Sequence, residues 1–193
     1  MLMLTSAATS TDKQVSPKRW ASSFCNVLTG YADNMKSVNS DIEDTTKNVE
    51  SAVTSDPTKV FDYIAELADE VGHAAKISAR AADKVRALPR PQVGGGTILK
   101  RSLSRALGGG LDDIAAQFRK AESEFERIPK ETTDPTTAAL RLASAASDAE
   151  SALEGVGSTI SSSLENLNAK NIDPKHLLAR ALKAAHACAP VFG

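Results

Sequence analysis

The sequence predicts an all-α fold, an antiparallel up-down four-helix bundle with a short fifth C-terminal helix. Of the 193 residues, 41% are hydrophobic but only 4% are aromatic. Such a composition, rich in Ala, Ser, Leu, Glu and Lys, favours helices packed through small side chains over β-sheets. A chain of this length buries roughly 70% of its unfolded surface, so it needs neither a metal nor a disulfide framework to fold.

Four proline junctions predict where helices begin. In each, the side-chain oxygen of Ser or Asp can cap the amides of the first turn, and the proline that follows suits the first helical position. The junctions are Ser16-Pro17, Asp56-Pro57, Asp134-Pro135 and Asp173-Pro174.

The first two helices each carry a heptad-like stripe of apolar residues. Spacings that alternate between four and three keep such a stripe on one face of a helix. The first helix, of about nine turns, begins at Pro17, and the second runs from Pro57 until Pro89 and Pro91 end it. The first stripe comprises Phe24, Leu28, Tyr31, Met35, Val38, Ile42, Thr45, Val49 and Ala52. The second comprises Val60, Ile64, Leu67, Val71, Ala74, Ser78, Ala81, Val85 and Leu88.

Thr97 is the predicted N-cap of the third helix, whose stripe is interrupted by Gly108 to Gly110. Each glycine costs about 1 kcal/mol relative to Ala inside a helix, so we expect a kink, a break or a close helix contact there. The fourth helix runs from Pro135 to about Leu167, and the fifth from Pro174 to Cys188. The third stripe comprises Leu103, Leu107, Leu111, Ile114, Phe118, Ala121, Phe125 and Ile128. The fourth comprises Leu142, Ala146, Ala149, Leu153, Val156, Ile160 and Leu167.

Short connections between long helices predict antiparallel neighbours that cross at about 20°. Residues 1–16 are expected to form a disordered N-terminal tether, and residues 17–193 a single helical domain. The up-down order places Cys25 and Cys188 in the same third of the bundle. A disulfide between them and two buried thiols are both compatible with this placement.

The turn between the second and third helices is predicted to be strongly basic. Between Lys76 and Arg105 there are eight basic residues and one acidic residue, Asp83, which gives a local charge of +7 in a chain of net charge -1. Backbone amides of the glycines ahead of a helix N-terminus can hold an anion. The candidate anion-binding residues are Arg86, Arg90, Gly94, Gly95, Gly96, Thr97, Lys100, Arg101 and Arg105.

Several other functions have little support in the sequence. The net charge of -1 argues against specific nucleic-acid binding, and a Walker phosphate loop is missing. Glu70 and His73 have the Glu-x-x-His spacing of di-iron bundles, but the apolar stripe turns His73 outward. His186 lies two positions before Cys188 without a third group to orient it. We therefore expect neither an enzyme nor a cofactor.

Three short segments resemble small helical proteins and lipoproteins that are widespread in actinobacteria. They are Ser16-Pro-Lys-Arg-Trp-Ala-Ser-Ser-Phe-Cys25, Leu88-Pro-Arg-Pro-Gln-Val-Gly-Gly-Gly96 and Ala187-Cys188-Ala-Pro. The resemblance implies a helical architecture and paired cysteines, and transfers no catalytic residue. Many such proteins are exported or lipid-anchored, whereas the apolar start, Met1 to Leu4, is too short for an export segment. We expect an extracytoplasmic or membrane-associated protein, with the cytoplasm as the alternative.

These features favour a non-catalytic interaction or structural module. The basic turn is expected to dock on an anionic surface, such as a membrane, a wall polymer or an acidic protein, although a merely solvated loop would have the same sequence. The alternative is a carrier of an apolar ligand or lipid between amphipathic helices, and a third possibility is helix-mediated assembly. A slot for such a ligand is suggested by the small residues Ala74, Ser78, Ala81, Ala146 and Ala149.

Overall fold

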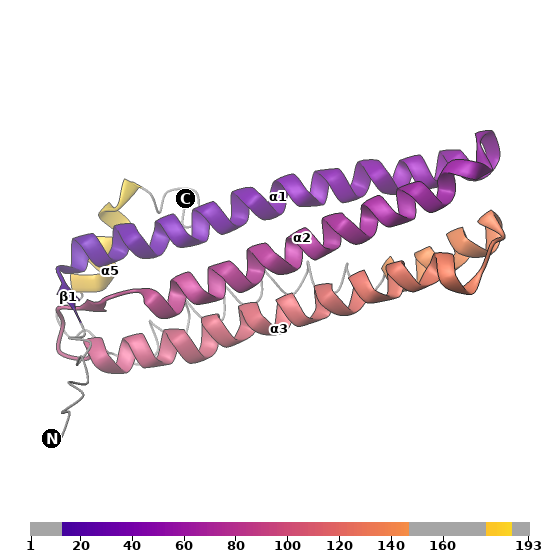
Figure 1. Cartoon of the computed structure of the whole chain (residues 1–193). Helices are drawn as coiled ribbons and strands as arrows, with labels where there is room; N and C mark the ends of the chain where they lie inside the picture. Colours follow the sequence, from indigo (N-terminus) through magenta and orange to yellow (C-terminus); the bar gives the residue numbers. More distant parts are fainter. Residues whose placement is uncertain (1–12, 147–176, 187–193) are drawn as a thin grey trace, which may run out of the picture.

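A computed structural model describes residues 13–146 and 177–186 of the chain. Four main helices pack against one another, with a short fifth helix after them, so the predicted fold class is confirmed (Figure 1). The fourth helix is described over residues 135–146. The other elements are β1 (Gln14–Val15), α1 (Pro17–Ser55), the 3-10 helix η1 (Pro57–Lys59), α2 (Val60–Ala87), β2 (Arg90–Pro91), α3 (Gly96–Glu131) and α5 (Leu177–Ala184).

Two of the predicted helix starts are capped as expected. The hydroxyl of Ser16 accepts a hydrogen bond from the Arg19 amide at 3.4 Å, and a carboxylate oxygen of Asp134 accepts one from the Thr137 amide at 2.8 Å. The start at Pro57 differs, because residues 57–59 form η1 and α2 begins only at Val60. There the Asp56 carboxylate accepts from the Thr58 hydroxyl at 2.6 Å. The junction Asp173-Pro174 lies outside the described residues.

The predicted apolar stripes form the core of the bundle. Every residue of the second and third stripes is buried, and so is every residue of the first except Ile42, which is partly buried. Transfer of one large apolar side chain from water to such a core stabilises a fold by about 1.5–3 kcal/mol. The fourth stripe beyond Ala146 lies outside the described residues.

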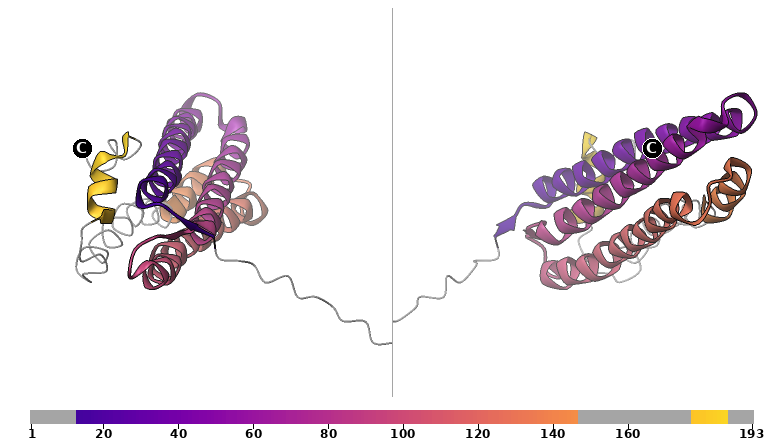
Figure 2. Two further views of the ribbon diagram at one scale, coloured as in Figure 1. Left: turned by 90° about the vertical axis from the view of Figure 1, so that its left-hand side faces the viewer. Right: turned by 45° about the vertical axis from the view of Figure 1, so that its right-hand side comes forward.

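Helix α2 packs against both α1 and α3. The three helices run along a common axis, with α2 antiparallel to α1 and α3 (Figures 1 and 2). Two polar contacts cross the interface between α1 and α2. The hydroxyls of Tyr31 and Ser78 lie 3.2 Å apart, and the Thr45 hydroxyl donates to Glu70 Oε1 at 2.8 Å. Side-chain hydrogen bonds therefore add to apolar packing in holding α1 and α2 in register.

Helix α3 passes through Gly108 to Gly110 without a break, and a close contact accounts for the first of these glycines. A Cβ atom on Gly108 would lie 3.3 Å from Arg86 Nε, and Arg86 donates to the Gly108 carbonyl at 3.1 Å. The absence of a side chain at Gly108 thus leaves room for an arginine of α2.

The third helix begins two residues earlier than predicted, because its N-cap is Gly95 and not Thr97. The Thr97 hydroxyl instead accepts a hydrogen bond from the Arg90 guanidinium at 2.8 Å. A Cβ atom on Gly96 would lie 2.1 Å from the Pro91 carbonyl oxygen, so the tight turn before the helix requires glycine.

A parallel pairing of β1 with β2 is a feature that the sequence did not predict. The Arg90 amide donates to the Lys13 carbonyl at 3.2 Å, the Gln92 amide donates to the Val15 carbonyl at 2.8 Å, and Val15 is buried. The predicted disordered tether is therefore wrong for residues 13–16, which belong to the fold. Residues 1–12 lie outside the described residues.

Helix α5 packs against α1, beside the half of α1 that follows β1 (Figure 1). Leu178 of α5 and Ala185, the residue that follows α5, are buried in the core. This is the placement that the up-down order predicts for the C-terminal helix.

Candidate functional site

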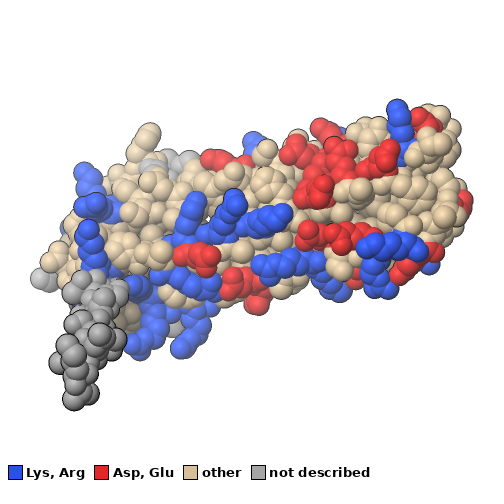
Figure 3. Space-filling model, viewed as in Figure 1, with Lys and Arg blue, Asp and Glu red and all other residues tan. Residues whose placement is uncertain are grey.

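Basic side chains gather at the end of the bundle where α1 begins, α2 ends and α3 begins. On the face seen in Figure 3, this left-hand end displays Lys and Arg without Asp or Glu, whereas acidic side chains gather toward the opposite end. We call this region the basic end. Its basic residues are Lys13, Lys18, Arg19, Lys84, Arg90, Lys100, Arg101 and Arg105.

The charges at the start of α1 oppose the usual preference of a helix N-terminus, whereas Lys84 in the last turn of α2 follows the preference of a C-terminus for cations. The first turns of α1 and α3 contain no acidic residue, and α1 carries Lys18 and Arg19 there. A helix N-terminus already bears a partial positive charge, so acidic side chains are the stabilising choice. The positive potential of this end is raised by Lys100 and Arg101 in the second turn of α3 and, in the first turn of α1, by Lys18 and Arg19. Helix stability does not explain them.

Arg86 is a packing residue, although the sequence makes it an anion-binding candidate. It forms ion pairs with Asp112 of α3 and, at 3.6 Å, with Asp83. The hydrogen bond with Asp112 is the main cause that raises the pKa of Arg86. Its charge is thus matched within the fold, and its place in the structure is a link between α2 and α3.

Arg90 likewise supports the turn. Its guanidinium donates to the Thr97 hydroxyl at 2.8 Å. On the other side, in the amide orientation that satisfies both groups, Gln14 accepts from Arg90 Nε at 3.2 Å. Arg90 thus links β1 to the start of α3. Because neither of these two partners carries a charge, they do not neutralise the positive charge of Arg90 at this end.

The sequence suggested that the amides of all three glycines are available to an anion. In the structure at least one of them is already used. The Gly96 amide donates to the Val93 carbonyl at 3.0 Å, and Gly95 is the N-cap whose carbonyl accepts from the Leu99 amide at 2.9 Å. Gly94 is exposed, and a Cβ atom there would meet nothing within 4 Å. The turn therefore serves first to start α3.

Lys100, Arg101 and Arg105 are the remaining basic candidates, and all three lie near the start of α3. Arg101 and Arg105 are exposed on the first turns of α3, while Lys100 is half-buried and engaged in a contact. Between Gly94 and Arg101, Ile98 is 63% exposed. The basic end thus presents an apolar side chain among its cations.

The structure adds Lys13, Lys18 and Arg19 to the basic residues that the sequence singles out. All three are exposed. The junction Ser16-Pro17 already placed Lys18 and Arg19 in the first turn of a helix at this end, so their contribution could have been predicted. Lys13 reaches Arg90 only through the pairing of β1 with β2, which is too short to leave a sequence signal.

A cavity of about 490 Å³ lies in the other half of the bundle. Its volume falls within the range of about 300–1,000 Å³ that is typical of small-molecule sites. Four helices contribute to it: α1, α2, α3 and the fourth helix. The lining residues are Asn39, Ile42, Glu43, Thr46, Lys47, Val49, Glu50, Leu67, Val71, Phe125, Ala139, Leu142, Ala143 and Ala146.

The composition of the cavity differs from the predicted slot. Of the five small residues expected to line it, Ala146 alone does so among the described residues. Larger side chains such as Leu67, Val71 and Phe125 form its apolar wall instead. Among the described residues, its polar lining residues come from one face of α1, so this part of the cavity has an apolar interior and a polar rim on α1.

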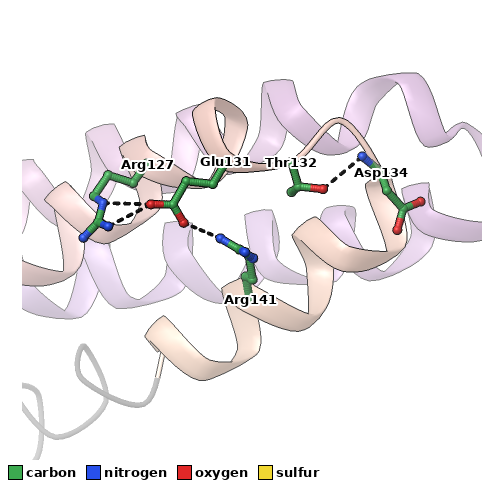
Figure 4. A network of polar contacts seen from close by, with 5 residues as sticks. All are labelled: Arg127, Glu131, Thr132, Asp134 and Arg141. Carbon is green, nitrogen blue, oxygen red and sulfur yellow. Dashed lines mark hydrogen bonds and ion pairs between the residues drawn. The ribbon is translucent and has the colours of Figure 1, made fainter.

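A network of ion pairs fixes the turn beside this cavity (Figure 4). Arg127 donates to Glu131 Oε1 through Nε at 3.1 Å and Nη2 at 2.8 Å, and Arg141 pairs with the other oxygen of Glu131. Arg127 and then Arg141 hold the pKa of Glu131 below its usual value. The amide of Asp134 donates to the Thr132 hydroxyl at 3.1 Å. These contacts orient the fourth helix against α3.

The Glu-x-x-His pair does not form a metal site in the described structure. His73 is exposed, as predicted, while Glu70 faces α1 and accepts from Thr45. Glu70 Oε2 is buried without a hydrogen-bond partner, and burial raises the pKa of this carboxyl. Within residues 13–146 and 177–186, His, Cys, Asp and Glu side chains form no group able to hold a metal ion.

Of the two cysteines, Cys25 is fully buried on α1, and no free cysteine is found among the described residues. Cys188 lies outside the described residues, so the bond between them stays a prediction. Across the described ranges, no helix has the length and apolar content needed to cross a bilayer. Searches of protein-family models, curated proteins and solved structures found no match to this chain.

Proposed function

We propose that this chain is a non-catalytic interaction module that docks through its basic end on an anionic lipid surface. The observation that carries the proposal is the convergence of Lys13 and of cations from α1, α2, β2 and α3 on one end, where both α1 and α3 begin. Each cation near an anionic membrane contributes about 1 kcal/mol to binding. Several together suffice for reversible docking that weakens as salt is added.

The exposed Ile98 favours a lipid surface over a soluble polyanion. An apolar side chain that enters the headgroup region loses contact with water, which a polymer in solution does not offer. Ile98 stands in the first turn of α3, close to Lys100 and Arg101 in sequence. Docking would therefore combine charge with shallow apolar insertion.

Co-sedimentation with vesicles tests this proposal. The natural chain is expected to bind vesicles of phosphatidylglycerol and not of phosphatidylcholine. The triple variant Arg19→Glu/Arg101→Glu/Arg105→Glu should lose most of this binding. A matched control, Lys36→Glu/Arg119→Glu/Lys130→Glu, changes the net charge equally away from the basic end and should bind better than the first variant. Equal binding by the two variants, or binding to a soluble polyanion without binding to vesicles, contradicts the proposal.

We also propose a disulfide between Cys25 and Cys188 that joins the C-terminal segment to α1. Helix α5 already packs on α1, and the described part of the C-terminal segment ends at His186, two positions before Cys188. Closing a loop of this length stabilises a fold by roughly 5 kcal/mol on the chain-entropy model. Such a bond would indicate an oxidising compartment outside the cytoplasm.

Mass measurement of natively produced protein tests the disulfide. Reduction should increase the intact mass by two hydrogens, and digestion without reductant should yield a peptide pair that contains both cysteines. Two thiols that react with a maleimide in the unfolded, unreduced protein would contradict the bond and would favour the cytoplasm.

Carriage of an apolar ligand is the second candidate function, and the cavity of about 490 Å³ favours it. A largely apolar interior reached from one polar rim suits an amphiphilic molecule. Native mass spectrometry of protein purified from its source checks this candidate. A carrier should retain a small molecule that organic extraction removes, and uniformly empty protein would argue against it.

A further inference from the structure

We infer that the cavity selects an apolar molecule with a positively charged head group. The inference rests on the second candidate function, carriage of an apolar ligand, and names the chemistry that the cavity recognises. It is independent of docking through the basic end, which lies at the other end of the bundle.

The apolar interior accounts for the tail of such a ligand. Val71 is fully buried, and Leu67 and Phe125 are each 2% exposed, so a tail between them would be shielded from water. Ala139 and Ala146, both partly buried, form the facing wall with Leu142. No side chain of this interior carries a charge or a hydrogen-bond donor, so a hydrocarbon tail would leave no polar group of these residues unsatisfied.

The rim accounts for the positive head group. Glu43 and Glu50 are exposed carboxylates that line the cavity on α1, seven residues apart and therefore on the same face of the helix. Asn39 donates to Glu43 Oε1 at 2.6 Å, which orients that carboxylate without neutralising it. An ammonium group held between these carboxylates would gain the attraction of both.

Lys47 does not reverse the sign of the rim. It is the one basic residue among the lining residues named above, and it forms an ion pair with Asp44 at 3.0 Å. With Asp44 included, the described residues of the rim carry three carboxylates and one ammonium. On the face seen in Figure 3, acidic side chains gather over the upper part of this half of the molecule, with Lys and Arg below them. A carboxylate head group, as in a fatty acid, would be repelled here.

Isothermal titration calorimetry with three amphiphiles of one chain length tests the inference. The probes are decyltrimethylammonium, 1-decanol and decanoate, each below the concentration at which it forms micelles. At low salt, the natural chain should bind decyltrimethylammonium about ten-fold more tightly than decanoate, because two partly exposed charge contacts change from repulsion to attraction. The affinity for 1-decanol should lie between them.

Charge reversal at the rim distinguishes recognition from a general effect of net charge. Glu43→Lys/Glu50→Lys should invert the order, so that decanoate binds more tightly than the ammonium probe. The control Asp33→Lys/Glu126→Lys changes the net charge equally at exposed positions outside the cavity lining and should keep the natural order. Inversion of the order in both variants would overturn the inference.

Filling the cavity provides a second test. Ala139→Phe should abolish binding of all three probes while circular dichroism retains the natural helical signal. If the natural chain binds the probes without regard to head group, the inference fails and apolar carriage stands. If it binds none of them, both fail, and vesicle docking is unaffected.

Discussion

The two ends of the bundle manage their charges in opposite ways. At the turn before the fourth helix, charged groups are matched inside the fold, as in the pairs of Glu131 with Arg127 and Arg141. At the basic end, Lys18 and Arg19 stand at a helix N-terminus whose partial charge repels them. Charges that work against helix stability point to a role outside the fold, which is why the basic end carries the proposed function.

The two ends also differ in how their cores are filled, and core substitutions should show the largest effect. Leu107 is fully buried at the basic half, whereas Leu67 borders the cavity. Leu107→Ala is expected to lower the free energy of unfolding by about 4 kcal/mol, and Leu67→Ala by about 2–3 kcal/mol, because a side chain beside a void loses fewer contacts. Urea unfolding of both variants checks the order. A larger loss for Leu67→Ala would mean that the cavity is not an empty space in the folded protein.

The glycine turn sharpens the comparison, because the basic end depends on its geometry. Gly96→Ala should destabilise the protein by about 2 kcal/mol or more, since the new Cβ would collide with the Pro91 carbonyl and the backbone must shift. Gly94→Ala is the matched control, with open space at that position, and should change stability by less than about 0.5 kcal/mol. Thermal unfolding of the two variants measures the contrast. Equal melting temperatures would show that the turn is not held at Gly96.

Arg86 offers a smaller effect that separates packing from docking. A double-mutant cycle of Arg86→Met with Asp112→Asn should give a coupling of about 0.5–1 kcal/mol, as expected for a partly exposed ion pair. Arg86→Met should leave vesicle binding close to that of the natural chain, because Asp112 and Asp83 already match this charge. If Arg86→Met loses as much vesicle binding as the triple variant of Arg19, Arg101 and Arg105, then Arg86 contributes directly to docking.

The smallest expected effect concerns pH, and its sign differs between two glutamates, Glu70 and Glu131, that both lie in the half that holds the cavity. Burial raises the pKa of Glu70, so its contribution favours the fold below the ordinary pKa of glutamate and is lost as the pH rises through the raised value. Ion pairs lower the pKa of Glu131, so its contribution is present above the ordinary value and is lost as the pH falls. Glu70→Gln should therefore stabilise the protein slightly at pH 7 and by less near pH 4. Urea unfolding at both pH values checks this, with the exposed Glu126→Gln as control; equal shifts in the two variants would contradict it.

Regular features of the fold could be predicted from the sequence because they repeat. The stripe through Phe118 recurs at heptad spacing over many turns, and proline junctions such as Ser16-Pro17 mark helix starts with two independent signals. The cavity could not be predicted, because its volume depends on how four helices meet. The roles of Arg86 and Arg90 were also hidden. Their partners, Asp112 and Gln14, are remote in sequence and become neighbours only after packing.

Trp20 is the single tryptophan of the chain, is 1% exposed, and stacks on Phe24 with the ring centroids 5.0 Å apart. Its fluorescence emission therefore reports only on the surroundings of the first turns of α1. Circular dichroism, by contrast, averages over all helices. If the two signals change at one denaturant concentration, the bundle melts as a unit; if the emission changes later or earlier, the two halves are separate cooperative units.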